Sequence, residues 1–140
     1  MKSFEFTTRR VLLGRLERGD SVLEGLTEFC KTNGIQVGHL EALGVVERGG
    51  IGYYDHLRRT FREVHFEEGM EIASLTGNVS RKDGVTFLHC HVVLADREGR
   101  CFGGHLLEGN VAFACEFAVT DLEGMAPERS LDESTGLALW

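Results

Sequence analysis

Residues 87–109, FLHCHVVLADREGRCFGGHLLEG, form two apolar segments joined by a short polar turn. The turn, Asp96-Arg97-Glu98-Gly99, ends in a glycine, which tolerates the positive φ that tight turns require. The segment before the turn is apolar on both of its faces, as expected for a strand in the middle of a sheet. The two segments therefore predict adjacent antiparallel strands within a larger sheet.

Further short strands are predicted on both sides of this pair. Arg81-Lys82-Asp83-Gly84 has the composition of a hairpin turn, and Glu47-Arg48-Gly49-Gly50 predicts a second turn. The expected strands are 9–17, 35–46, 51–54, 59–66, 70–80 and 111–120.

One amphipathic helix is predicted between Asp20 and Gly34. Asp20 or Ser21 can cap its N-terminus, with Glu24 as the return partner of a capping box. The pair Asn33-Gly34 is expected to end it. We expect an α+β fold, a mostly antiparallel β-sheet with flanking helices, and a single domain over residues 1–140. The apolar face of this helix comprises Val22, Leu23, Leu26, Phe29 and Cys30.

Composition and charge restrict the possible partners. The chain of 140 residues is 42% hydrophobic and carries a net charge of −7, which argues against strong autonomous binding to duplex DNA. No apolar run approaches the roughly 20 residues of a membrane span, and the N-terminus has no uninterrupted apolar run of the signal-peptide kind. We expect a cytoplasmic protein without a membrane partner.

Three histidines lie close to the turn at 96–99. His89 and His91 point to the same face of their strand, because side chains alternate along a strand, and we expect both to be largely buried. A turn centred near Arg97–Glu98 places 89–91 opposite 104–106, so His105 lies beside the pair. A β-bulge within 101–104 could rotate His105 onto the same face.

Three imidazoles converging from adjacent strands are typical of a three-histidine metal site. Such a site leaves a position open for water or substrate, and imidazole ligands suit zinc best. Gly103 and Gly104 permit close approach by a ligand or by another backbone. Spacing alone leaves open the alternative that these histidines are hydrogen-bonded structural residues. His39, with Glu41 two residues on, could add a fourth ligand, although an ordinary strand histidine is the simpler interpretation.

Several motifs resemble the plants-and-prokaryotes-conserved (PPC) domain family. They are SLTGNVSRKDGVTFLHCHVVLADREGRCFGGHLLEG at 74–109, GYYD at 52–55 and DESTGLALW at 132–140. The resemblance extends from about Arg9 to Trp140, and the Leu-x-Gly-Asn-Val-Ser, His-x-His and Gly-Gly-His-Leu motifs are its most specific parts.

The resemblance implies an antiparallel sheet with flanking helices, assembled as a homotrimer. It also implies metal binding through His89, His91 and His105, in an arrangement similar to the zinc site of acetolactate decarboxylases. A metal-dependent, lyase-like activity on an unknown small molecule follows by analogy of fold alone. Glu108, Glu116 and Arg100 are nearby in sequence, without an assigned acid–base role.

The family also includes plant proteins that bind AT-rich DNA through a preceding AT-hook, and its prokaryotic members are labelled DNA-binding by association. This chain has no Arg-Gly-Arg-Pro core, which the AT-hook requires. A DNA-binding patch could still involve Arg58, Arg59 and Arg62, although charges on a solvated edge strand are the preferred explanation for them. The third possibility is a plain assembly domain without ligand chemistry, in which VAFACEFAVT and the C-terminal LALW supply core or interface.

Overall fold

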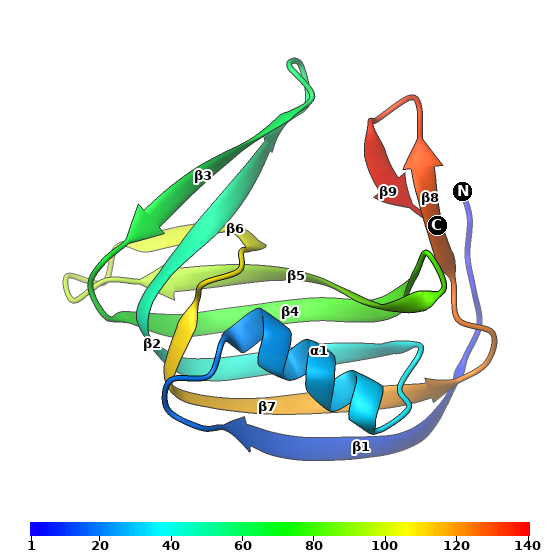
Figure 1. Ribbon diagram of the computed structural model, residues 1–140, viewed down its shortest axis with the longest axis horizontal. Helices are drawn as coiled ribbons and strands as arrows, with labels where there is room; N and C mark the ends of the chain where they lie inside the picture. Colours follow the sequence, from blue (N-terminus) through cyan, green and yellow to red (C-terminus); the bar gives the residue numbers. More distant parts are fainter.

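The computed structural model of the protein describes residues 1–140 and contains one helix and nine strands (Figure 1). The helix, at 11 residues, is too short to cross a bilayer. The expected α+β fold is confirmed, with a single helix where the sequence suggested more than one. The elements are β1 (Thr7–Leu16), α1 (Val22–Thr32), β2 (Gly38–Asp55), β3 (Thr60–Phe66), β4 (Met70–Lys82), β5 (Val85–Ala95), β6 (Cys101–Leu106), β7 (Val111–Glu123), β8 (Glu128–Asp132) and β9 (Leu137–Leu139).

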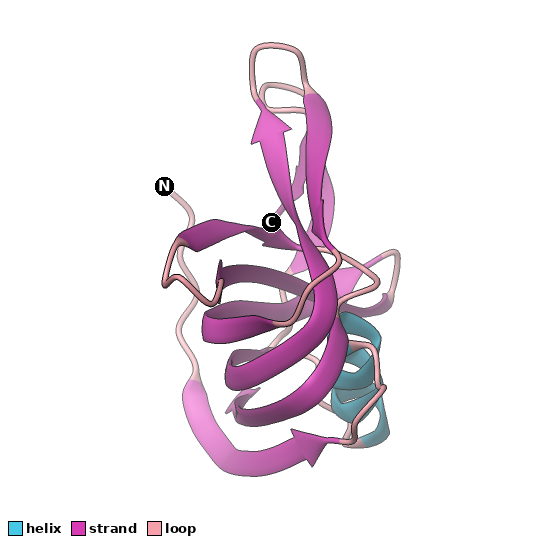
Figure 2. Cartoon of the chain, turned by 90° about the vertical axis from the view of Figure 1, so that its left-hand side faces the viewer, coloured by secondary structure: helices cyan, strands magenta, loops and turns pink.

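The long strand β2 organises the sheet. Its first half lies between β7 and β4, whereas its second half pairs with β3 and β6. Because β5 joins β4 to β6, the strands β2, β4, β5 and β6 close on themselves. All pairs are antiparallel except β4–β8, and the curvature of the strands is visible from the side in Figure 2.

The turn predicted at 47–50 does not form, because β2 continues through these residues. Gly49 instead makes room for the buried side chain of Asn110, and Gly50 makes room for the ring of His65. The Asn110 amide accepts a hydrogen bond from the Gly50 N–H at 3.2 Å and donates to the Gly50 carbonyl at 2.9 Å. The two glycines therefore mark a close contact between segments within an irregular strand, rather than a reversal of the chain.

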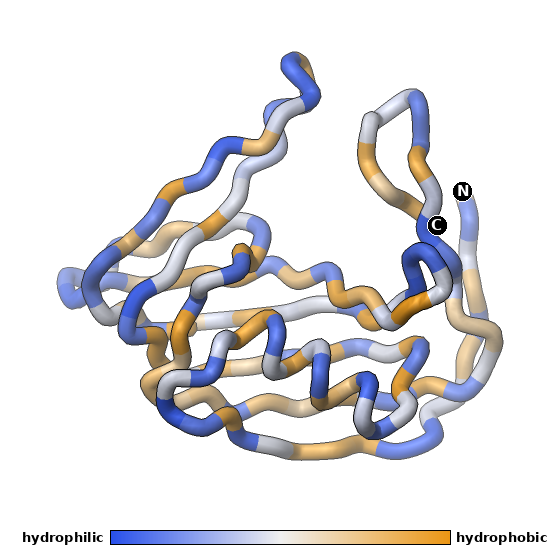
Figure 3. The backbone as a smooth tube through the Cα atoms, in the orientation of Figure 1, coloured by the Kyte–Doolittle hydropathy of each residue, from blue (hydrophilic) through white to orange (hydrophobic).

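The helix α1 covers one face of the sheet, as Figures 1 and 2 show. Val22, Leu26 and Cys30 lie four residues apart and are fully buried against it. The strand side of the same core includes Leu88, Cys90, Val92 and Leu94 of β5, so this face of β5 points toward the helix. In Figure 3 the apolar stretches follow the sheet beneath α1, and the projecting tips are hydrophilic.

The sequence predicted the C-terminal end of α1 correctly and its N-terminal cap incorrectly. Gly34 adopts φ +67° and Ile35 N–H donates to the Cys30 carbonyl, which completes the expected glycine-terminated C-cap. At the N-terminus Ser21 makes no side-chain cap bond, so the predicted capping box is wrong. The Val22 N–H donates instead to the backbone carbonyl of Asn110 at 2.8 Å, which ties the start of the helix to β7.

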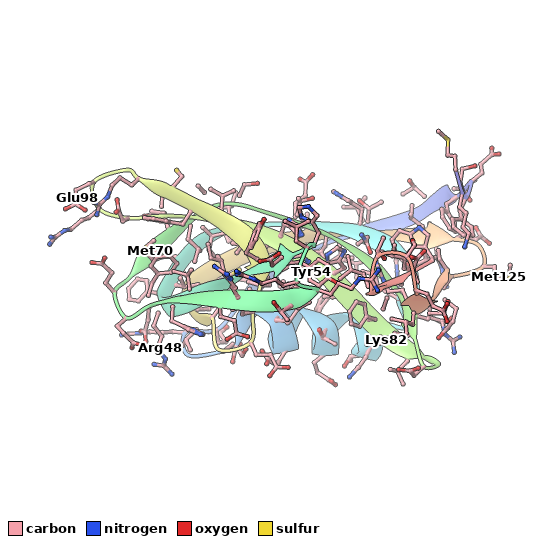
Figure 4. All side chains as sticks on the ribbon, turned by 90° about the horizontal axis from the view of Figure 1, so that it is seen from above. Arg48, Tyr54, Met70, Lys82, Glu98 and Met125 are labelled. Carbon is pink, nitrogen blue, oxygen red and sulfur yellow. The ribbon has the colours of Figure 1, made fainter.

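Two hairpins project from the sheet (Figure 1): the arm formed by β2 and β3, and the C-terminal hairpin of β8 and β9, which the sequence did not predict. The two touch, because the Tyr54 hydroxyl donates to the Thr135 carbonyl at 2.8 Å and Arg59 donates to the Ser134 carbonyl at 3.0 Å. Seen from above, Tyr54 lies over the middle of the molecule, between Glu98 at one end and Met125 at the other (Figure 4).

Candidate metal centre

The three predicted histidines come together on one face of the β5–β6 hairpin. His91 of β5 lies directly opposite His105 of β6 in the antiparallel register, and His89 is two residues from His91 on the same face. The register from His91 to Ala95 against β6 is regular. The β-bulge suggested from the sequence is therefore not needed, because directly opposed residues already share a face.

The imidazole nitrogens are close enough to share one ion. One ring nitrogen from each histidine lies within 4.8 Å of the others, and the ring centroids are separated by 4.3 to 5.3 Å. Around a tetrahedral zinc ion with Zn–N bonds of about 2.0–2.1 Å, ligand atoms are roughly 3.4 Å apart. Small side-chain rotations would bring the three nitrogens to that spacing, so the cluster could hold a metal ion.

The cluster is more exposed than the sequence predicted. His91 is exposed, and His89 and His105 are half-buried. The prediction of a largely buried pair is wrong because only one face of β5 packs under α1, and the histidines lie on the other. An exposed face is the arrangement that a site with an open coordination position requires.

The surroundings of His89 and His105 favour the neutral form of their rings by lowering the pKa of each. Burial lowers the pKa of His89 from 6.5 to about 4, with contributions from His105, Arg129 and His91. Burial also lowers the pKa of His105, with a contribution from His91, while a hydrogen bond to the backbone of Gly52 acts in the opposite direction. Neutral imidazole is the form that binds a metal ion, so these shifts favour metal binding at neutral pH.

The β2–β3 arm forms one wall of the cluster. The ring of Phe61 meets His105 edge-on, with centroids 5.3 Å apart, and Tyr54 packs on Phe61 at 5.0 Å. Gly52 is the direct neighbour of His105 across the β2–β6 pair. No sequence pattern placed Phe61 or Tyr54 at the site, because that placement depends on the pairing of β2 with both β3 and β6.

Arg129 of β8 was also missed by sequence reasoning. Its guanidinium lies 4.1 Å from the centroid of Trp140 and 5.4 Å from that of Phe87, and it donates to the Asn78 side chain at 2.8 Å. Asn78 is the cross-strand neighbour of His89, so Arg129 lies close to the cluster. No local motif marks this arginine, since the parallel β4–β8 pair that brings it here joins distant parts of the chain.

The other candidate ligands lie apart from the three histidines. Nε2 of His39 is 3.1 Å from the Thr76 hydroxyl, and neither His39 nor Glu41 belongs to the metal-ligating group. Glu41 is separated from His91 by strand β4, since both residues pair with Thr76. The three possible acid–base residues also lie elsewhere: Arg100 in the β5–β6 turn, Glu108 in the loop after β6, and Glu116 on β7.

The three arginines of the suggested DNA-binding patch lie on the arm, Arg58 and Arg59 in its turn and Arg62 on β3. Arg58 and Arg62 are exposed and approach the same carboxylate, that of Asp55, at 3.7 and 3.8 Å. Arg59 adopts φ +53° and turns to the C-terminal hairpin. The three side chains therefore do not present a uniform basic surface.

Comparison with known proteins places this geometry in context. A metal-containing protein from Archaeoglobus fulgidus is 44% identical, with a TM-score of 0.96 over 100% of this chain and 99% of that one. A plant- and prokaryote-conserved (PPC) protein from Pyrococcus horikoshii is 37% identical, with a TM-score of 0.93 over 100% and 96% of the two chains.

Two solved structures of lower sequence identity are also similar to this chain. A protein from Ralstonia eutropha named as a candidate DNA-binding protein is 27% identical, with a TM-score of 0.82 over 91% and 88% of the chains. The α-acetolactate decarboxylase of Bacillus subtilis shares the fold at 14% identity, with a TM-score of 0.60 over 96% of this chain and 61% of that enzyme.

The chain also matches part of a longer protein and the model of a domain family. The bifunctional protein GlmU of Synechococcus is 30% identical over 91% of this chain, and the chain spans 20% of that protein's length. The model of the Plants and Prokaryotes Conserved (PCC) domain matches residues 3–123, which include all three histidines and exclude the C-terminal hairpin. The chain therefore belongs to the Plants and Prokaryotes Conserved domain family.

Proposed function

We propose that His89, His91 and His105 bind a divalent metal ion, zinc by preference, and leave a coordination position open to a small-molecule ligand. The observation that carries this proposal is the convergence of three imidazoles, with one nitrogen of each within 4.8 Å of the others. The similar Archaeoglobus protein is described as metal-containing, which supports the assignment. Imidazole nitrogens in a three-ligand set favour zinc among the common divalent ions.

The open position defines what such a site can do. A bound zinc ion acts as a Lewis acid that polarises a carbonyl or carboxylate oxygen. The protein's own residues shape access to it: Phe61 and Tyr54 form an apolar wall on one side, and Asn78 and Arg129 form a polar wall on the other. A small polar molecule with an oxygen donor suits these surroundings better than an apolar one, and we propose that it is encountered in the cytoplasm.

Metal analysis of purified, untagged protein tests the proposal. The wild type is expected to contain one equivalent of metal after incubation with zinc and dialysis, and His91→Ala is expected to lose it. His39→Ala is the matched control, because His39 is an exposed histidine on a neighbouring strand outside the cluster. Circular dichroism confirms that both variants are folded. A wild type that retains no zinc would refute the site.

We also propose that the chain assembles as a homotrimer. Exposed apolar side chains on one face of the sheet support this, since Leu13 of β1 is 81% exposed and Leu43 of β2 is 59% exposed on a surface that also includes β7. Exposed apolar surface of this kind is typical of protein interfaces.

A DNA-binding role is the second candidate function. It is supported by the name of the similar Ralstonia protein and by the exposed arginines Arg58, Arg59 and Arg62. The shared carboxylate of Asp55 and the net charge of −7 weigh against it. Binding to a duplex should weaken steeply with salt and should be lost on replacing these arginines by glutamine. Binding that is absent at low salt would exclude this role.

A further inference from the structure

Arg129 is a buried charge without a counter-charge. It is 6% exposed and takes part in none of the ion pairs of the structure. The other two buried charged residues are compensated: Asp96 pairs with Arg100 at 2.6 Å, and Asp121 pairs with Arg10 at 2.8 Å. Buried charges in proteins are normally paired, so an unpaired arginine at this depth requires an explanation.

The hydrogen bonds of Arg129 use part of its donor capacity, and none of them is made to a negatively charged group. Nε donates to the Ser80 hydroxyl at 2.8 Å, Nη1 to the Ala138 carbonyl at 2.9 Å and Nη2 to the Asn78 amide oxygen at 2.8 Å. All three acceptors are neutral. A guanidinium has two N–H groups on each terminal nitrogen, so one on Nη1 and one on Nη2 remain without a partner.

Arg129 lies beside the three histidines, because it binds the residue opposite His89. The β4–β5 register places Asn78 opposite His89 and Ser80 opposite Phe87, so the guanidinium spans the two residue pairs next to the cluster. Its ring contacts with Phe87 and Trp140 hold the planar group in place. The burial that surrounds Arg129 lowers its pKa, yet an arginine remains charged at any physiological pH.

We propose that Arg129 is the anion-binding half of the ligand site and holds the carboxylate of a small carboxylic acid whose other oxygen donor faces the three histidines. This inference rests on the proposed metal site only for the second contact of the ligand, because the carboxylate contact is made by Arg129 alone. Two free N–H groups on the terminal nitrogens match the two oxygens of a carboxylate.

The charge at the site fits a carboxylate better than a phosphate. Arg129 contributes one uncompensated positive charge, which a carboxylate neutralises. A second cation, the half-buried Lys82, contacts the same Phe87 ring, with its ammonium 5.5 Å from the ring centroid. A doubly charged phosphate at this depth would leave negative charge uncompensated and costly to bury.

The alternative to anion binding is that Arg129 has a purely structural role, and the experiments must distinguish the two. By donating to the Ala138 carbonyl and stacking on Trp140, Arg129 also fastens the C-terminal hairpin to the sheet. A substitution at residue 129 could therefore act by loosening this hairpin. Trp140 is the single tryptophan of the chain, so its fluorescence reports on the hairpin in every variant.

The first experiment uses metal-free protein, so that its outcome does not depend on the metal. The side-chain Nε–Hε resonance of Arg129 is followed by NMR during titration with acetate, and with acetamide as the uncharged analogue of the same shape. We expect a saturable shift with acetate and none with acetamide. The exposed Arg97 resonance, from the β5–β6 turn, is the internal control. An Arg129 signal that does not move with acetate, or that moves equally with acetamide, would overturn the proposal.

The second experiment uses zinc-loaded protein and malonate, measured by calorimetry. Arg129→Met is expected to weaken malonate binding about tenfold or more, Arg129→Lys to weaken it less, and Arg97→Met to leave it unchanged. Unchanged malonate affinity in Arg129→Met with native Trp140 fluorescence would refute the subsite. If Arg129→Met disturbs that fluorescence, the malonate affinity of Arg129→Lys is the test instead. An affinity equal to that of the wild type, with native Trp140 fluorescence, would refute the subsite. Acetate binding to Arg129 in a protein that takes up no zinc would sustain this inference while refuting the metal site.

Discussion

Gly104 on β6 lies directly against the carbonyl oxygen of Gly52 on β2, so that a Cβ at residue 104 would be 2.5 Å from that oxygen. This close approach occurs beside the short β2–β6 pair, in which Gly52 lies opposite His105. Gly104→Ala should therefore push β6 away from β2 and destabilise the protein by about 1–3 kcal/mol. Because His105 follows Gly104, zinc affinity should also fall, which titration against a chromogenic chelator would measure.

Gly103→Ala is the matched control for this change. A Cβ at residue 103 would be 3.6 Å from the nearest atom, which is an ordinary contact. We expect near-wild-type stability and zinc affinity for this variant. Equal effects of the two alanine substitutions would show that the β2–β6 contact does not position His105.

The buried amide of Asn110 should be essential for stability. It donates to the carbonyls of Gly50 and Leu107 and accepts from the Gly50 N–H. Asn110→Ala leaves these buried backbone groups without partners, and we expect a loss of about 2–4 kcal/mol in the free energy of unfolding. Urea denaturation measures it, with Glu108→Ala in the adjacent exposed loop as the control. A loss below that of the control would mean that water replaces the amide.

The metal-free protein should become less stable as the pH falls through the range set by His89. The pKa of His89 is about 4 in the folded protein, whereas an unperturbed histidine, as in the unfolded chain, has a pKa of 6.5. The unfolded chain therefore binds more protons than the folded protein between these two values. The contribution of His89 is thus complete above about pH 6.5 and is lost as the pH drops toward 4, on the order of 2 kcal/mol.

The variant His89→Gln isolates this effect from the titration of carboxylates. The difference in unfolding free energy between wild type and variant should change between pH 6.5 and 4 and stay constant above that range. Urea titrations across the range provide the measurement. A pH-independent difference would show that the His89 pKa is not depressed.

The proposed trimer should depend on the exposed apolar side chains of β1 and β2. Leu13→Asp or Leu43→Asp places a charge where an interface would bury it, and we expect dissociation to monomers. Light scattering coupled to size exclusion measures the mass. Leu57→Asp, which changes a leucine of the β2–β3 turn that is 84% exposed, should leave the mass unchanged. A wild type that is monomeric would refute the assembly.

The sequence predicted those parts of the fold that depend on local pattern. The period of Val22, Leu26 and Cys30 predicted α1, and the turn residues at 96–99 predicted the register that places His91 opposite His105. The errors came from contacts between distant segments. Gly49 and Gly50 resemble a turn, but their partner is Asn110, sixty residues later. The depth of the histidines could not be predicted for a similar reason, because it depends on which face of β5 the helix covers.

All three histidines belong to one hairpin, and only residues 92–104 separate His91 from His105. Closing so short a loop costs little chain entropy, so the unfolded chain can bring the same ligands together transiently. A metal ion would therefore retain some affinity for the denatured ensemble, and it would raise the melting temperature by less than its affinity for the native state implies. The same locality would let the ion join these two strands early in folding, before β2 has closed the sheet around them.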